Sequence, residues 1–271
     1  MPALQLGRLA AANGDHYVKV PKLYHQAWFY RKDSPFETWQ LSLIRNAVEG
    51  RLDESLCRVA DVGGGTGRFA QLLHSSLGLK QNVLCVDLSP DMLSQASQLP
   101  GVDTLLKDCV EFAAELPEAC FDRFLLKEVV HHVPPKDLGA FYRGLYTGLR
   151  KDGVCLTVTR PKERIEYPFF EQARQVWIRD QPEATDFATA MELAGYKGVT
   201  IREHTFPVTL SKQLWMDMVS DRFWSTFARS NFDDDELAAG IQEIDAAFPA
   251  DERGDISFNE RMIFIEGYKH V

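Results

Sequence analysis

Residues 59–67 read Val-Ala-Asp-Val-Gly-Gly-Gly-Thr-Gly, and this stretch decides the fold of the 271-residue chain. It joins an apolar, strand-like run to glycines, whose backbone can turn sharply and admit a ligand to main-chain N–H groups. A segment with helical spacing, Arg68–Leu73, comes next, and the following apolar run ends at Asp87, twenty positions beyond Gly67. The order of strand, loop, helix and acid-ended strand predicts a nucleotide site in which Asp87 accepts hydrogen bonds from the ribose hydroxyls of an adenosine.

Two further apolar runs, Phe121–Leu126 and Gly153–Thr159, extend this pattern along the chain. Stretches with helical spacing lie between the runs, near residues 67–78, 90–98 and 136–150. Alternation of buried strands with helices is typical of a parallel sheet that carries helices on both faces. The sequence therefore predicts an α/β fold built on a doubly wound sheet.

The pattern changes after Thr159, where helical stretches near 167–178 and 185–195 precede a strand-like run at Val199–Phe206. The last strand-like run is Arg261–Tyr268, and the long stretch before it is mostly helical in pattern. The N-terminal residues are rich in aromatic side chains and precede the first strand. We expect a helical lid at 1–50, a sheet domain at 51–207 and 259–271, and a helical cap inserted at 208–258.

Composition and charge limit the kinds of partner that the chain can bind. The chain has 45% hydrophobic and 25% charged residues, which is typical of a globular protein, and its net charge of −9 repels nucleic acid and anionic lipid. No apolar run reaches the roughly 18–20 residues of a membrane helix, and Met1–Gly14 lacks the features of a secretory signal. The five cysteines form no close pair, so reduced thiols are expected. We expect a cytoplasmic protein that binds neither nucleic acid nor membranes.

The glycine loop carries a resemblance to a known family. Asp61–Gly67 and Asp87 resemble the first two motifs of class I S-adenosylmethionine-dependent methyltransferases, and within that class the small-molecule group (UbiE-like, methyltransferase type 11/25). Leu88–Leu93 is similar to the turn that packs on adenine in that family, and Phe121–Val133 to its fourth strand and the following segment. The resemblance spans about 59–160 and implies a Rossmann-like, seven-stranded, mostly parallel sheet that binds S-adenosylmethionine.

The same resemblance implies roles for single residues. Met92 packs on adenine, Asp108 meets the adenine amino group, Cys109 supplies a backbone donor, and Lys127 is a backbone contact at the methionine end of the cofactor. Gly64 departs from the family, which often has Cys or Ser there, and a loop that binds through its backbone should tolerate that change. The cofactor-binding residues implied are Asp61, Gly63, Gly65, Gly67, Asp87, Leu88, Met92, Asp108, Cys109 and Lys127.

A dinucleotide dehydrogenase is the alternative, because it shares the strand, the glycine turn and the distant acid. Its fingerprint is Gly-x-Gly-x-x-Gly, whereas Gly63, Gly65 and Gly67 are spaced by two and preceded by Asp61. This spacing favours a compact nucleoside that bears an amino acid over a pyrophosphate.

Methyl transfer from a sulfonium requires mainly alignment and exclusion of water, and a general base only where the acceptor must lose a proton. His131 and His132 follow the fourth strand, at the edge where such sheets bind ligands, and are the candidate bases. Bracing of the loop is their alternative role. Arg160 follows the fifth strand and can pair with an acceptor carboxylate, stay solvated or close a lid.

Other candidates for contact with the acceptor lie in the expected lid and cap. They are Tyr24 and Tyr30 in the lid, and Trp215 and Arg222 in the cap, where packing within the cap is the alternative role of the apolar side chains. Phe232–Leu237, with its run of acids, predicts the start of a helix rather than a metal site. No metal is expected.

Three functions compete: a methyltransferase for a small molecule, a methyltransferase for protein or RNA, and a nonenzymatic module that keeps the cofactor fold. The acidic charge and the two covering elements favour the first. The Asp/Asn-Pro-Pro-Tyr/Phe signature of many nucleic-acid and glutamine N-methyltransferases is replaced here by Lys127–His132, which weakens the second. The intact glycines and Asp87 weaken the third.

Overall fold

The computed structural model describes residues 31–48 and 56–270 of the chain. Their contacts divide them into two compact units. The sheet unit comprises Trp39–Arg160, Glu183–His204 and the segment from Met262 onward, and the aromatic unit comprises the residues up to Thr38, Pro161–Pro182 and Thr205–Arg261. Residues 1–30 of the expected lid lie outside the described part, and the lid and cap stay predictions.

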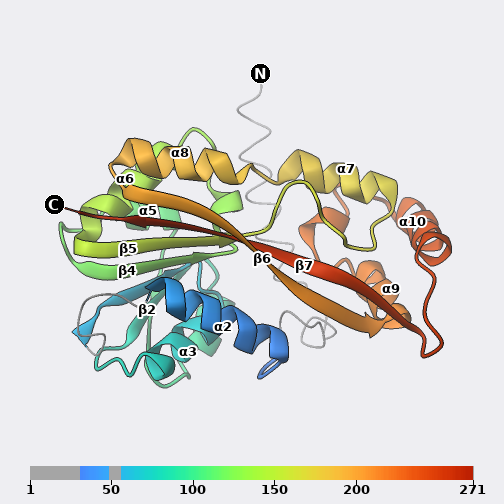
Figure 1. The fold of residues 1–271 in the computed structure, drawn as a ribbon, viewed down its shortest axis with the longest axis horizontal. Helices are drawn as coiled ribbons and strands as arrows, with labels where there is room; N and C mark the ends of the chain where they lie inside the picture. The colour runs from blue at the N-terminus through green and yellow to red at the C-terminus, as the bar shows by residue number, and fades with distance from the viewer. Residues whose placement is uncertain (1–30, 49–55, 271) are drawn as a thin grey trace. The chain divides into compact units, whose positions relative to one another are not determined.

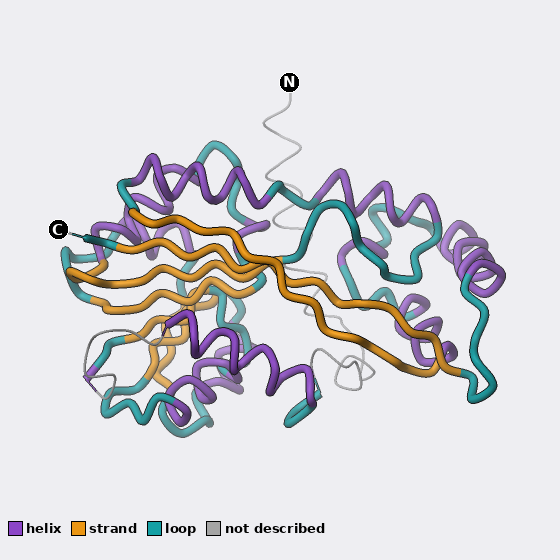
Figure 2. The backbone as a smooth tube through the Cα atoms, in the orientation of Figure 1, coloured by secondary structure: helices purple, strands orange, loops and turns teal. Residues whose placement is uncertain are grey.

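The described residues contain one seven-stranded sheet with the strand order β3-β2-β1-β4-β5-β7-β6 (Figures 1 and 2). Neighbouring strands from β3 to β5 are parallel, while β7 is antiparallel to β5, with Leu156 opposite Glu266. The expected fold class is confirmed. The strands are β1 Val59–Val62, β2 Val83–Asp87, β3 Val102–Leu106, β4 Phe121–Lys127, β5 Leu149–Thr159, β6 Lys197–Ser211 and β7 Asp255–Tyr268.

Burial explains why the central strands occupy the middle of the sheet. All four residues of β1 are buried, as are the first six of β4, whereas four of the five residues of β3 are not. Strands that are apolar throughout need cover on both faces, and a strand with one buried residue can lie near an edge. The parallel order also brings the carboxyl ends of β1, β2 and β4 to one edge of the sheet.

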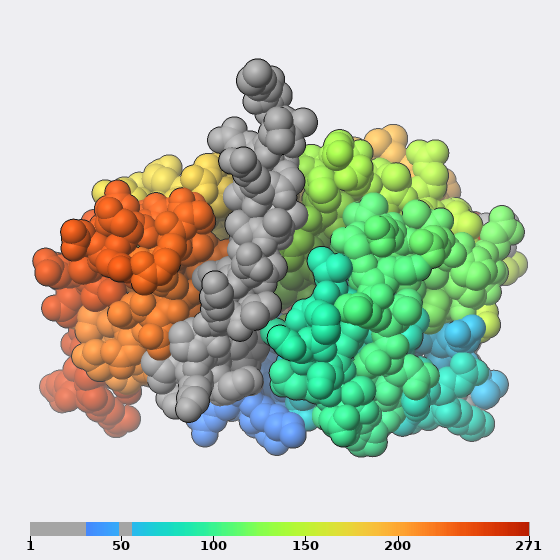
Figure 3. All heavy atoms as spheres, turned by 180° about the vertical axis from the view of Figure 1, so that it is seen from behind, coloured from blue at the N-terminus to red at the C-terminus, as the bar shows by residue number. Residues whose placement is uncertain are grey.

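Helices cover the sheet. α5 (Cys109–Ala114), α6 (Leu138–Gly148) and α8 (Ala184–Ala194) pack side by side on one face, and α3 (Arg68–Ser76) lies across the other (Figure 1). α4 (Pro90–Ala96) packs against β2 and β3. Seen from behind, much of the exposed surface of this unit comes from the teal-to-green middle of the chain (Figure 3).

A buried arginine fastens α2 (Pro35–Val48) to the sheet. Arg123 on β4 is 1% exposed, and its Nε donates a hydrogen bond of 2.6 Å to the carbonyl of Val48, the last residue of α2. Its Nη1 donates to the carbonyl of Asp122. A cation at the C-terminus of a helix interacts favourably with the helix dipole, so Arg123 helps to hold this end of α2.

The aromatic unit has a core of large rings. Trp215 is fully buried and donates from its indole nitrogen to the carbonyl of Pro168 at 2.8 Å. The Tyr167 hydroxyl donates to Glu260 at 2.6 Å, and both residues are buried. The described α-helices that lie wholly in this unit are α7 Glu171–Asp180, α9 Lys212–Ser220 and α10 Asp234–Ala247.

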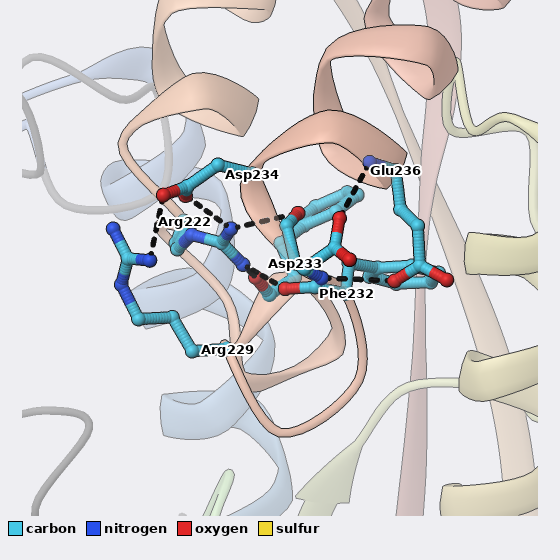
Figure 4. A network of polar contacts seen from close by, with 7 residues as sticks. Arg222, Arg229, Phe232, Asp233, Asp234 and Glu236 are labelled. Carbon is cyan, nitrogen blue, oxygen red and sulfur yellow. Dashed lines mark hydrogen bonds and ion pairs between the residues drawn. The ribbon is translucent and has the colours of Figure 1, made fainter.

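The start of α10 confirms the prediction for the acidic run. Asp233 accepts from the backbone N–H of Glu236, and Glu236 accepts from the backbone N–H of Asp233, which together form a capping box (Figure 4). Arg222 donates to the carbonyls of Phe227, Phe232 and Asp233 and to the carboxylate of Asp234. The acids therefore order a helix N-terminus.

The close packing of α5 on α6 can be tested with two glycines of α6. A Cβ at Gly144 would lie 2.2 Å from the carbonyl oxygen of Ala113, whereas a Cβ at Gly139 would meet nothing within 4 Å. Because overpacking costs about 1–3 kcal/mol, Gly144→Ala should lower the free energy of unfolding by this amount in urea titrations. Gly139→Ala is the control and should raise it by up to about 1 kcal/mol, because alanine favours helix. Equal effects would contradict the packing.

Candidate functional site

The loop between β1 and α3 turns through three glycines in the left-handed region. The φ values are 73° at Gly63, 55° at Gly65 and 72° at Gly67. A Cβ at Gly63 would lie 2.4 Å from Val129, whereas no described residue other than its chain neighbours lies within 4 Å of a Cβ placed at Gly65. The loop therefore needs glycine for packing at its start, and it leaves its backbone accessible at Gly65.

Asp87 ties the glycine loop to the end of β2. One carboxylate oxygen accepts from the backbone N–H of Gly65 at 2.9 Å, and the other accepts from that of Ser89 at 2.9 Å. Each carboxylate oxygen has two acceptor sites, so one further hydrogen bond can form at each. Asp87 is held in place by the fold and can still receive ligand hydroxyls.

Asp61 is a buried acid beneath the loop. Its side chain is almost fully buried, and within the described structure its Oδ2 accepts no hydrogen bond. Burial, and to a smaller extent the charge of Asp87, raises the pKa of Asp61 to about 7, although the charge of Lys127 opposes this shift. The Lys127 ammonium lies 4.4 Å from the centre of the Phe69 ring. Asp61 can thus change its charge near neutral pH when a ligand binds.

Apolar side chains flank the acid of β2. Leu88, directly after β2, is 65% exposed, and Leu106, at the end of the edge strand β3, is 56% exposed. Met92, on α4, is half-buried. An apolar ligand surface placed over these residues would bury them. Leu106 is therefore a further candidate for contact with the ligand, which the sequence analysis did not select.

Asp108 and Cys109 lie at the start of α5. Asp108 is the N-cap, and its carboxylate accepts from the backbone N–H groups of Val110 at 2.8 Å and Glu111 at 3.2 Å. Burial raises the pKa of the Cys109 thiol to about 12, so the thiol stays protonated at neutral pH. These two residues offer a positioned acceptor and a backbone donor rather than a reactive thiolate.

The residues after β4 and β5 form a second cluster of charged and ionisable groups. Glu128 pairs with Arg160, and both side chains are largely buried. His131 and His132 form a short 3-10 turn, with ring centres 4.1 Å apart. Burial lowers the pKa of His131 to about 4 and that of His132 to about 3, so both rings are neutral at pH 7. Arg160 is paired here rather than solvated.

Sequence reasoning placed His131, His132 and Arg160 at this edge but missed Glu128. The only signal for Glu128 in the sequence is its place directly after the fourth strand. Its backbone has a φ of 58°, a left-handed conformation that only the structure reveals.

The remaining candidates for acceptor contact lie in the aromatic unit or outside the described residues. Trp215 packs inside the aromatic unit, and the guanidinium of Arg222 is held by carbonyls and Asp234 of that unit. Tyr24 and Tyr30 lie outside the described residues. Contact of these four with an acceptor stays a prediction.

The chemistry open to this site follows from its groups. The described residues contain no cluster of His, Cys, Asp or Glu arranged to hold a metal ion. All five cysteines are free thiols. None of the described helices combines the length and apolar character needed to cross a membrane. Open backbone at Gly65, a fixed acid at Asp87 and exposed leucines suit an adenosine.

Comparisons with known proteins found a matching family model for part of the chain and solved structures with a similar fold. Residues 59–153 match the family model described as a methyltransferase domain. The YcgJ protein of Bacillus subtilis is 18% identical over 86% of this chain and 99% of its own, with a TM-score of 0.57. An S-adenosylmethionine-dependent methyltransferase of Archaeoglobus fulgidus is 16% identical over 86% of this chain and 93% of its own, with a TM-score of 0.53.

A third solved structure is phosphoethanolamine N-methyltransferase 2 of Haemonchus contortus, determined with S-adenosylmethionine. It is 17% identical over 92% of this chain and 56% of its own, with a TM-score of 0.58. At such identities the likeness to all three structures shows a shared fold. The search of curated proteins found no match to the chain.

Gly64 should be required by its surroundings, although a loop that binds through its backbone would by itself accept a side chain. A Cβ there would lie 2.8 Å from the sulfur of Cys85 and 2.9 Å from the carboxyl of Asp61. We expect Gly64→Ala to lower the free energy of unfolding by about 1–3 kcal/mol because of overpacking. Cys85→Ala removes the sulfur, so the double variant should recover at least about 0.5 kcal/mol relative to the sum of the single changes. Strict additivity in denaturant titrations would refute this account.

Proposed function

We propose that this chain, whose residues 59–153 form a methyltransferase domain on a class I fold, is an enzyme that transfers the methyl group of S-adenosylmethionine to a small molecule. The observation that carries the proposal is the position of Asp87. Its carboxylate is fixed by the N–H groups of Gly65 and Ser89, beside an open glycine backbone and exposed leucines. This set of groups recognises a ribose, a backbone-bound amino acid and an apolar base together.

The residues that would hold the cofactor lie at or just after the carboxyl ends of strands β1, β2, β3 and β4. Asp87 would accept from the ribose, Leu88 and Met92 would cover the base, and Asp108 would meet its amino group. Asp61 and Lys127 would lie toward the amino-acid end. When bound, S-adenosylmethionine supplies a methyl group on a positively charged sulfur that leaves as a neutral thioether. The chain itself aligns the acceptor and excludes water, which is where most of the rate enhancement of such a displacement arises.

The acceptor we propose is a small molecule rather than protein or RNA. The net charge of −9 opposes binding to the phosphates of RNA. Lys127 and Glu128 stand where many enzymes acting on nucleic acids or glutamine have an Asn-Pro-Pro-Tyr type sequence. The intact glycine loop, with three glycines in the left-handed region, argues against a module that has lost its cofactor. His131 and His132 stay candidates for contact with the acceptor.

The proposal is tested first by cofactor binding. Purified protein should bind both S-adenosylmethionine and S-adenosylhomocysteine in calorimetry. Asp87→Ala should weaken binding at least tenfold, because each hydrogen bond to a charged group contributes about 1.5–3 kcal/mol. Asp103→Ala is the matched control, since Asp103 is an exposed acid of β3 bonded to Asn82. Absence of binding to either compound, or equal affinity in a folded Asp87→Ala variant, would refute the assignment.

Asp61 should make cofactor binding depend on pH. Its pKa is raised to about 7 without ligand, and a cationic ligand nearby favours the ionised form. Below pH 7 a proton must therefore leave on binding, and affinity should rise between about pH 6 and pH 8. Calorimetry at pH 6.5 in buffers of different ionisation enthalpy measures this proton release, which Asp61→Asn should reduce. The same release from both proteins would contradict the role of Asp61.

A further inference from the structure

Glu128 occupies a strained position at the end of β4. Its φ of 58° places a non-glycine residue in the left-handed region, which costs free energy. Its backbone N–H donates to the carbonyl of Val158 at 2.8 Å, so pairing with β5 continues past the end of β4 and holds this conformation. Glycine would relieve the strain. Strain of this kind tends to be kept where a side chain has a function.

The carboxylate of Glu128 has one oxygen engaged and one available. Oε2 pairs with Nη1 of Arg160, whose side chain is 10% exposed. Oε1 is buried and accepts no hydrogen bond from any described residue. A buried acceptor without a donor is costly, and more so for a charged group. A ligand donor that reaches Oε1 would remove this cost.

His131 presents a second unpartnered nitrogen in the same cluster, which accepts a hydrogen bond when the ring proton is on Nε2. Its Nδ1 is buried and, among the described residues, has no hydrogen-bond partner. The ring is neutral at pH 7, because burial and the charge of Arg160 lower its pKa to about 4. A neutral imidazole has one nitrogen that accepts a hydrogen bond. The charge of Glu128 acts on the neighbouring His132, which places all these groups in one electrostatic environment.

We propose that Glu128 selects the methyl acceptor and that this acceptor is an amine, whose N–H groups bind to Oε1 of Glu128 and to His131. This inference rests on the proposed function of the chain. The reacting species is the neutral amine, formed by loss of a proton to water. Its nitrogen lone pair forms a bond to the methyl carbon, the carbon–sulfur bond breaks with its electron pair on sulfur, and the positive charge moves to nitrogen.

An amine fits these residues better than an alcohol does. An alcohol must lose its proton as it is methylated, and the two histidines are too weakly basic to take that proton readily. An amine nitrogen needs no base during the transfer step and instead gains positive charge. The carboxylate of Glu128 would stabilise that charge as it develops in a water-poor site. Arg160 holds the carboxylate in place by pairing with its other oxygen.

The chemical class of the acceptor is tested with a matched panel. Amines, alcohols and carboxylic acids of the same carbon skeletons are incubated with the full chain and methyl-labelled S-adenosylmethionine. We expect transfer to amines at least tenfold faster than to the matching alcohols or acids. Preference for alcohols or acids, or no transfer to any amine by protein that binds the cofactor, would overturn the proposal. Failure to bind the cofactor would instead overturn the proposed function.

The role of Glu128 is tested with Glu128→Gln. This variant should bind S-adenosylhomocysteine within twofold of the original affinity and unfold at a similar temperature. It should bind the accepted amine at least tenfold more weakly in calorimetry with the S-adenosylhomocysteine complex, and lower kcat/KM by at least tenfold. Asp152→Asn is the matched control, because Asp152 also has a left-handed backbone, with φ of 59°. Asp152 lies near the start of β5, whereas Arg160, the partner of Glu128, follows the end of this strand. Amine binding within twofold in Glu128→Gln would overturn the proposal.

Discussion

The turn from β1 into α3 is the constraint on which the rest of this structure depends. The backbone N–H groups of Gly63 and Gly64 both donate to the carbonyl of Val86, which ties the loop to β2. Ala96 of α4 leaves no room for a Cβ at Gly67. Because the loop is held this closely, Gly65 is left to face open space and to bond with Asp87. A side chain at Gly63 would displace Val129, and one at Gly67 would displace α4.

Buried charge at the carboxyl edge of the sheet is the second organising feature. Asp61 on β1 carries a raised pKa beneath the loop, and Glu128, directly after the neighbouring strand β4, pairs with Arg160, directly after β5. Burying such groups costs free energy, which a bound cation or hydrogen-bond donor would offset. The same edge thus carries two buried acids, and we propose that Asp61 responds to the cofactor and that Glu128 binds the acceptor. A site of this kind is less stable than an apolar one but is preorganised for its ligands.

The aromatic unit shows what the helical spacing of apolar residues in the sequence could and could not predict. Trp215 lies at helical spacing among apolar residues, and its full burial agrees with packing inside the unit. Arg222, which sequence reasoning considered for the acceptor, has its donors occupied by carbonyls of its own unit. The acidic run at 233–236 was predicted from local physics alone, and its capping box confirms that prediction. Local rules succeeded there because a helix N-cap depends on four adjacent residues.

The sequence alone determined the order of strands and helices around the glycine loop and the identity of the acid at position 87. These features are local, since period, glycine and strand-end chemistry act over a few residues. The short edge strand β3, with one buried residue, has too little apolar pattern to be found by periodicity. Only the tertiary structure decided that Gly64 faces Cys85, that Arg160 is paired, and that Glu128 is strained with an available oxygen. Each of these depends on burial and on contacts between residues far apart in the chain, which no short stretch of sequence specifies.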